Sequence, residues 1–216
     1  MKTKNINQLY VITILLAVIA VSCKKGSGNS NSSSSNNPGS GSTTSVLCDG
    51  NGSTTYFPLS LNNKWIYNNT YLGKMAYKIS GTKTLSNGYS YYILYDTINY
   101  QTQTYYRVAS NGDIYEWGIS AGGSLEAAEH LFIPKSPTVG QYWKDQYLLP
   151  DSFVVVSTSA SVSTTNCSYT GCLKIQSFST GVSNSYYYYK EGIGKVKQTN
   201  AGGFSDITDL KSVSLQ

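Results

Sequence analysis

Apolar and polar residues alternate in short runs along most of the chain after residue 63. Because successive side chains of a β-strand point to opposite faces, each such run predicts a strand. Tyrosine, threonine and valine are frequent in these runs, which also favours pleated sheet. The expected strands are Trp65–Tyr67, Met75–Thr84, Tyr89–Asp96, Thr104–Ala109, Ile114–Ile119, Phe153–Ser161, Gly171–Ser179, Ser185–Lys190, Gly194–Thr199 and Phe204–Leu215.

Two asparagine-glycine pairs mark the connections between these strands. Asn87-Gly88 and Asn111-Gly112 each separate two runs, and this dipeptide accepts the positive φ that both central residues of a two-residue hairpin turn require. The pairs therefore predict hairpins, and nearly all strands are linked locally. The expected arrangement is an antiparallel meander.

One segment departs from the alternation. Ser124–Phe132 has a serine at a helix N-cap position, acidic residues in its first turn and apolar residues at helical spacing, and Pro134 follows it. It predicts a short helix that plugs or covers one end of the sheet.

Together these elements predict a mostly β domain. Its fold is a single antiparallel up-and-down sheet of about ten strands, curled into a half-barrel or closed into a barrel, with one short helix at an end. Both forms manage the unpaired edges of the sheet, and the sequence leaves the choice between them open.

The N-terminus has the layout of a secretory signal. Lys2 and Lys4 precede an uncharged 13-residue run, Leu9–Val21, which is shorter than the roughly 20 residues of a membrane-spanning helix. Small residues then lead to Cys23. We expect a cleaved signal peptide over residues 1–22, with an uncleaved anchor helix as the alternative.

A flexible tether follows. Residues 24–45 are almost entirely serine, glycine, asparagine and threonine, and they have no apolar surface to bury. We therefore divide the chain into the signal peptide 1–22, Cys23 with a tether over residues 23–45, and the β domain 46–216.

The net charge of +5 does not indicate a nucleic-acid partner. Four of the 16 basic residues and none of the 11 acidic residues precede residue 46, so the domain carries 12 against 11, a net charge of +1. No basic stripe interrupts the domain sequence, and nucleic-acid binding is not supported.

Three cysteines remain after Cys23, namely Cys48, Cys167 and Cys172. Cys167 and Cys172 flank a four-residue stretch and could pair across a hairpin loop. Alternatively, Cys48 pairs with one of them and closes a longer loop. The spacing predicts no metal site, and we expect no cofactor.

The titratable residues do not form a recognisable catalytic pattern. His130 is the only histidine, and no Gly-x-Ser-x-Gly segment accompanies it to supply a nucleophile. Two carboxyl groups at a defined separation would be needed for glycoside hydrolysis, and the sequence does not bring any two together. We expect no catalytic residues. The acids considered are Glu116, Glu126, Glu129, Asp145 and Glu191.

Tyrosines, 20 of the 216 residues, are the better indication of a binding surface. A tyrosine ring offers an apolar body and a polar tip, which suits sugar rings and acyl chains, although the same rings also suit a wide core. The residues proposed to contact a ligand are Tyr91, Tyr105, Tyr186 and Tyr188.

Several segments resemble known bacterial sequences. Ile19–Cys23 resembles the lipobox of bacterial lipoproteins, in which the cysteine is acylated. Tyr56–Tyr67 and Tyr188–Val196 resemble the "YxPLxxGNxWxY" opening and the "YYxxGxGxV" closing segment of a group of uncharacterised, Bacteroidota-type lipoproteins, with Asn62 in place of the usual glycine. The resemblance implies a curved antiparallel sheet, similar to the half-barrel of periplasmic lipoprotein carriers, and brings no activity.

The lipobox implies lipidation at Cys23 and anchoring by several acyl chains, which hold a protein to a membrane where one chain does not. The expected location is the bacterial outer membrane. We expect the protein to face the periplasm, because the acidic cluster associated with export to the cell surface in lipoproteins of this type does not follow Cys23. The first functional hypothesis is a non-enzymatic protein that binds an apolar or glycan ligand in the concave face of its sheet. The alternative is an accessory lipoprotein that contacts an envelope protein and has no small-molecule site.

Overall fold

The computed structural model describes residues 48, 50, 52–98, 103–118, 128–144, 152–178, 184–201 and 206–216. Residues 42–216 form one compact unit, which holds every strand. No helix in these described ranges is long and apolar enough to cross a membrane. The strands are β1 (Lys64–Asn69), β2 (Gly73–Thr84), β3 (Ser90–Asp96), β4 (Gln103–Val108), β5 (Ile114–Trp117), β6 (His130–Ile133), β7 (Tyr142–Lys144), β8 (Ser152–Ser163), β9 (Ser168–Phe178), β10 (Ser185–Lys190), β11 (Gly194–Asn200) and β12 (Asp206–Ser214).

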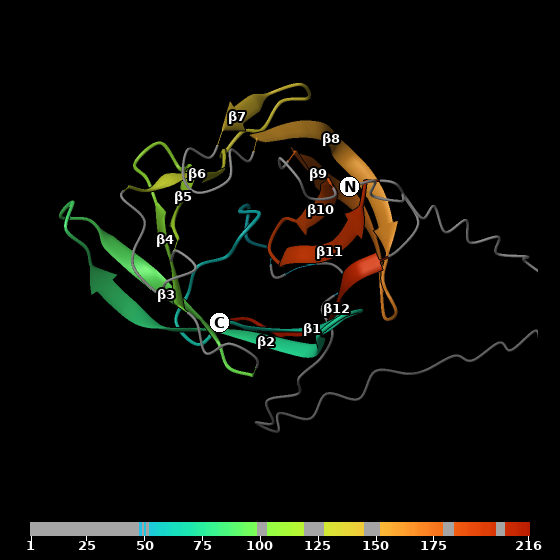
Figure 1. The fold of residues 1–216 in the computed structure, drawn as a ribbon, viewed down its shortest axis with the longest axis horizontal. Coiled ribbons are helices and arrows are strands. Elements are labelled where there is room, and N and C mark those ends of the chain that lie inside the picture. Colours follow the sequence, from blue (N-terminus) through green and yellow to red (C-terminus); the bar gives the residue numbers. More distant parts are fainter. Residues whose placement is uncertain are drawn as a thin grey trace, which may run out of the picture. The chain divides into compact units, whose positions relative to one another are not determined.

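The twelve strands form one antiparallel sheet that curls into a nearly closed barrel (Figure 1). Neighbours in the sheet are also neighbours in the sequence, except that β1 pairs with β12. This pairing joins the two ends of the strand series. The free edges of the sheet are therefore the short strands β6 and β7, which follow one another in the chain. The predicted up-and-down antiparallel sheet is confirmed, with twelve strands instead of about ten.

Each of the ten predicted strands is present with small shifts of its ends. The two strands that the sequence missed are the edge strands. β7 has only three residues around Trp143, too few for an alternation to be recognised, and β6 lies within the predicted helix.

The helix predicted over Ser124–Phe132 is wrong where the structure can be compared with it. His130, Leu131 and Phe132 belong to β6, which pairs with β5, and residues 124–127 lie outside the described residues. The described part of the chain contains no helix. Pro134 ends a strand here, because it lacks the N–H that would continue the ladder. Sheet pairing has overridden a local helical pattern.

Both predicted hairpins form, but their turns differ from the expected two-residue type. The N–H of Gly88 donates to the carbonyl oxygen of Leu85 at 3.0 Å, and only Gly88 has a positive φ, +83°, while Asn87 does not. The second hairpin repeats this pattern with Gly112 at +88°. Each asparagine side chain instead accepts a hydrogen bond from the N–H two residues later, which is an Asx turn.

The segment before β1 runs into the barrel (Figure 1, cyan). The buried ring of Phe57 stacks on Trp65 at 5.5 Å between centroids and meets the edges of Tyr106 and Phe132 at 5.0 and 5.5 Å. These partners belong to β1, β4 and β6, so Phe57 joins opposite walls of the barrel. This segment fills part of the interior, the role that the sequence assigned to a helix.

Two asparagines direct the chain from this segment into β1. Asn62 has a φ of +68°, a left-handed conformation that asparagine tolerates and that a glycine would adopt readily. The fully buried Asn63 donates through Nδ2 to the carbonyl oxygen of Pro58 at 2.8 Å and accepts from the N–H of Gln216 at 2.8 Å. Asn63 therefore fixes both the loop before β1 and the C-terminus.

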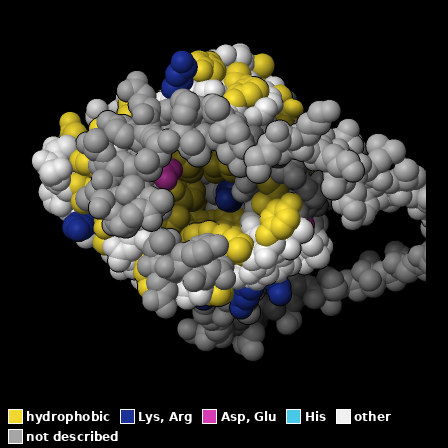
Figure 2. Space-filling view, viewed as in Figure 1, with side chains coloured by type: hydrophobic (Ala, Val, Ile, Leu, Met, Phe, Trp, Pro, Cys, Tyr) yellow, Lys and Arg dark blue, Asp and Glu magenta, His cyan; other side chains and the backbone are white. Residues whose placement is uncertain are grey.

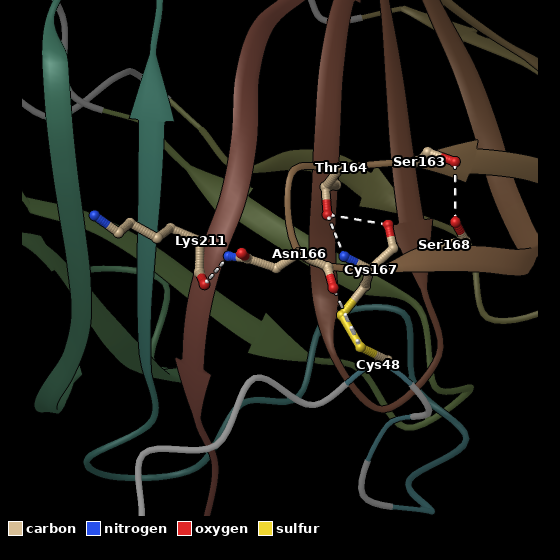
Figure 3. The surroundings of a disulfide bond; sticks show 7 residues. All are labelled: Cys48, Ser163, Thr164, Asn166, Cys167, Ser168 and Lys211. Carbon is tan, nitrogen blue, oxygen red and sulfur yellow. Dashed lines mark hydrogen bonds between the residues drawn. A yellow bond between two sulfur atoms is a disulfide. The ribbon is translucent and has the colours of Figure 1, made fainter. Parts of the chain in front are cut away.

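The disulfide bond joins Cys48 to Cys167 across 119 residues (Figure 3). The pairing of Cys167 with Cys172 is therefore wrong, and Cys172 is a buried free thiol. Cys167 closes the loop between β8 and β9, where the hydroxyl of Thr164 bonds to both its N–H and its carbonyl oxygen at 3.2 Å. The bond ties the start of the described chain to this loop.

Candidate functional site

The barrel encloses a cavity of about 390 Å³. Figure 2 shows this hollow from the side on which it opens, with hydrophobic side chains over its wall and a basic side chain within it. Ligand pockets in proteins typically measure about 300–1,000 Å³, so the cavity is large enough for a small molecule. It is lined by Phe57, Trp65, Tyr67, Tyr77, Leu94, Thr104, Tyr106, Glu116, His130, Leu131, Phe132, Phe153, Ile175, Tyr187, Tyr189 and Lys195.

One wall of the cavity carries a carboxylate and an imidazole. Glu116 of β5 and His130 of β6 are register partners, and Oε2 of Glu116 lies 3.9 Å from Nε2 of His130. Tyr106 of β4 faces Glu116 from the other side as its register partner. The sequence pattern does not indicate that Glu116 and His130 lie together, because it predicts His130 on a helix and not on a strand beside β5.

A β-bulge places Lys195, the only lysine among the described residues of the lining, in the cavity. Tyr188 pairs with Lys197, but Tyr189 pairs with Lys195, so β11 has one extra residue, Val196, at this point. In unbroken register Lys195 would face Lys190, whose ammonium reaches outward to the carbonyl oxygen of Thr170. The register shift moves Lys195 to the inner side, opposite Tyr189. Bulges commonly redirect a side chain next to a functional site.

Two glycines shape the chain just before this bulge. Gly192 and Gly194 have φ values of +70° and +107°, which are unfavourable for other residues. A Cβ on Gly194 would also lie 3.0 Å from Nε1 of Trp65, which donates to the carbonyl oxygen of Ile193 at 2.6 Å. The resulting tight bend holds β11 against the core tryptophan.

Lys195 has an unusual environment for a charged side chain. Its ammonium lies 5.5 Å from the ring centroid of Tyr67 and 5.9 Å from that of Tyr187. Within the described residues, Nζ of Lys195 has no hydrogen bond or salt bridge. Burial lowers the pKa of Lys195 to about 8, and the negative charge of Glu116 only partly opposes this effect.

The tyrosines around the cavity keep their protons. Burial is the main cause that raises the pKa of Tyr67, Tyr106 and Tyr189 well above its ordinary value. The charge of Glu116 adds to this effect at Tyr106 and Tyr189. Their hydroxyl groups therefore remain neutral donors at physiological pH, and that of Tyr67 donates to the carbonyl oxygen of Lys195 at 2.9 Å.

The four tyrosines proposed from the sequence to contact a ligand do not line this cavity. Tyr186 and Tyr188 lie on the outer face of β10, where their rings approach the ammonium of Lys174 at 3.8 and 5.4 Å. Tyr91 and Tyr105 belong to a separate apolar cluster with Leu85 and Trp117. Their neighbours in sequence, Tyr106, Tyr187 and Tyr189, line the cavity instead.

Outside the cavity, Glu129 takes part in a polar network on the face that carries Tyr91. Its carboxylate accepts from Nε of Arg107 at 2.6 Å, from Nη2 of Arg107 and from the hydroxyl of Tyr91 at 2.5 Å. The Arg107 guanidinium also lies 4.2 Å from the ring centroid of Tyr89. Although burial opposes it, hydrogen bonding by Arg107 and Tyr91 lowers the pKa of Glu129. The network therefore links Glu129, which precedes β6, to Arg107 of β4 and Tyr91 of β3.

Glu191, another of the acids considered from the sequence, is not among the residues that line the cavity. Glu191 is exposed in the turn before β11, and Glu126 and Asp145 lie outside the described residues. No group of three or more histidine, cysteine, aspartate or glutamate side chains in the described ranges could hold a metal ion.

We predict that Lys195→Met is more stable than the wild-type protein at pH 7, by about 1–3 kcal/mol, because an apolar side chain removes the cost of holding a charge in a mainly apolar cavity. The pKa of Lys195 is about 8 when folded and 10.5 ordinarily, so between these values the unfolded wild-type chain binds more protons than the folded one. The wild type therefore gains stability from this residue as the pH rises through that window, and the advantage of the variant shrinks.

Urea unfolding of both proteins at pH 7 and pH 9.5 measures this difference, and the contributions of the tyrosines and Cys172 cancel because both proteins have them. Lys197→Met on the outer side of β11 is the control, since Lys197 pairs with Asp209 at 3.5 Å. If the difference in unfolding free energy between Lys195→Met and the wild type does not change with pH, the lowered pKa of Lys195 is contradicted.

Comparison with protein-family models, with curated proteins and with solved structures gave no match to this chain. A functional assignment therefore depends on the geometry of the cavity and on the chemistry of the side chains that line it.

Proposed function

We propose that the protein binds a small apolar or amphiphilic molecule in the cavity of its barrel. The observation that carries the proposal is the cavity of about 390 Å³, whose wall is mainly aromatic and aliphatic. Such a pocket with a few convergent polar groups is the usual form of a small-molecule site. A solid interior would instead have favoured a partner protein on the outer surface.

The composition of the wall favours an apolar body over a sugar. A glycan needs a hydrogen-bonding partner for most of its hydroxyl groups, because unpaired polar groups are costly to bury. Among the described residues of the lining, the charged and imidazole side chains are Glu116, His130 and Lys195. The other polar groups are Thr104 and the tyrosine hydroxyls, and the rest of the lining is aromatic or aliphatic. A ligand with one polar end and an apolar remainder matches this distribution.

The proposal places this barrel in the bacterial envelope. The lipobox-like segment before Cys23 and the polar tether after it support a lipid-anchored protein, in which the tether separates the barrel from the membrane. Residues 1–47 lie outside the described residues, so this part of the proposal depends on the sequence. An anchored carrier of this kind binds and releases its ligand without a chemical step.

We predict that the neutral fluorescent probe N-phenyl-1-naphthylamine binds saturably to the barrel and that Tyr187→Ala weakens its binding about three- to ten-fold. Tyr187 lines the cavity, and an aromatic contact contributes about 0.5–1.5 kcal/mol beyond its buried area. The measurement is a fluorescence titration of the chain from residue 23 to 216 carrying Cys23→Ser.

Tyr186→Ala is the matched control, since Tyr186 precedes Tyr187 on β10 and faces outward against Lys174. It should bind the probe as the unsubstituted chain does. Circular dichroism and thermal melts establish that both variants are folded. If the probe does not bind, or if Tyr186→Ala weakens binding as much as Tyr187→Ala, the cavity is not the site.

We also predict that cells fed radioactive palmitate label the wild-type chain and not Cys23→Ser, because the cysteine thiol is the expected acceptor of the acyl chains. Autoradiography of the immunoprecipitated protein measures the incorporation. Equal labelling of the two chains would remove the lipid anchor from the proposal.

A further inference from the structure

The position of Lys195 in the cavity bears on the chemical group that the ligand carries. This inference rests on the proposed binding of a ligand in the cavity. The side chain reaches the inner wall because of the extra residue in β11, and without that bulge it would point outward. An outward lysine would be solvated and inexpensive, whereas a buried ammonium costs free energy unless it is paired. The fold thus directs a charge into an apolar cavity at a cost to stability.

The protein itself supplies only weak compensation for this charge. Two tyrosine rings lie beneath the ammonium, with centroids 5.5 and 5.9 Å away, near the outer limit of a useful cation–π contact. The carboxylate of Glu116 lines the same cavity, but it lies with His130 and Tyr106 on the wall formed by β4, β5 and β6. In the described structure it is not within ion-pair distance of Lys195.

The remaining titratable groups of the lining do not neutralise Lys195 either. They are the phenols of β1, β2, β4 and β10 and the imidazole of His130. The phenols of Tyr67, Tyr106 and Tyr189 are held in their neutral form by burial. Among the described residues of the lining Glu116 is the single acid, and none of these residues accepts a hydrogen bond from the ammonium of Lys195.

We propose that the ligand is an apolar molecule with a single anionic oxygen group, a carboxylate or sulfonate, that accepts hydrogen bonds from Lys195 while its apolar part packs against the aromatic wall. Charge-assisted hydrogen bonds of this kind are shorter and roughly twice as strong as neutral ones. A fatty acid and an aromatic acid share this chemistry. The anion compensates the buried ammonium, and the cavity wall buries the rest of the ligand.

The test uses the chain 23–216 carrying Cys23→Ser, with ligands that differ only at the polar end. Decanoate, decanol and decylamine compete with N-phenyl-1-naphthylamine at pH 7, and 1-anilinonaphthalene-8-sulfonate is compared with N-phenyl-1-naphthylamine as its uncharged counterpart. We expect at least one acid to bind about ten-fold more tightly than its neutral partner, which corresponds to about 1.4 kcal/mol. A preference for decanoate identifies an acyl acid, and a preference for the sulfonate alone identifies an aromatic acid.

Lys195→Met should reduce this preference to less than about three-fold. Lys197→Met should retain the preference, because Lys197 is on the outer side of the same strand, where it donates to the carbonyl oxygen of Ser163 at 2.8 Å. The preference should also decline between pH 7 and pH 9.5 as Lys195 loses its proton.

Equal affinity for acids and their neutral partners, or a preference that persists in Lys195→Met, overturns this inference and leaves the proposed function intact. Tighter binding of decylamine than of decanoate also overturns it, because Glu116 would then be the recognising group. If no ligand of either series binds, the proposed function fails as well.

Discussion

The pairing of β1 with β12 is the interaction on which the rest of the structure depends. It connects two meanders, β1–β6 and β7–β12, into one sheet that curves around an interior, and it leaves the open edges at the short strands β6 and β7. Once the sheet is curved, the two-residue period of each strand assigns its side chains to the inside or the outside, except where a register shift interrupts it. Asn63 stabilises this pairing through its contacts with Pro58 and Gln216.

The interior is filled unevenly, and this explains why a cavity remains. Phe57, from the segment before β1, packs between opposite walls and occupies part of the space. The rest of the interior is the cavity, which is lined mainly by aromatic side chains. The strand pairs contain several register shifts, and one of them, the bulge at Val196 in β11, sends Lys195 inward. This bulge, which follows the bend at Gly192 and Gly194, thus supplies the charge that we assign to ligand recognition.

The strands could be predicted from the sequence because alternation and turn residues are local signals. The face of each tyrosine could not, because a shift of one residue exchanges inside for outside and the run Tyr186–Tyr189 has aromatic rings at every position. Tyr187 and Tyr189 line the cavity, whereas the sequence pattern predicts Tyr186 and Tyr188 as the ligand contacts. The bulge at Val196, the strand β6 and the pairing of Cys48 with Cys167 all depend on contacts between distant segments.

The most direct test of the central claim observes the anion itself. Decanoate labelled with ¹³C at its carboxyl carbon can be followed by NMR when bound to the chain 23–216 carrying Cys23→Ser. Beside the ammonium of Lys195, the bound carboxyl should have a pKa below that of free decanoate, and in Lys195→Met its pKa should rise above the free value, because only the apolar wall remains. A bound carboxyl with the same pKa in both proteins would contradict the account.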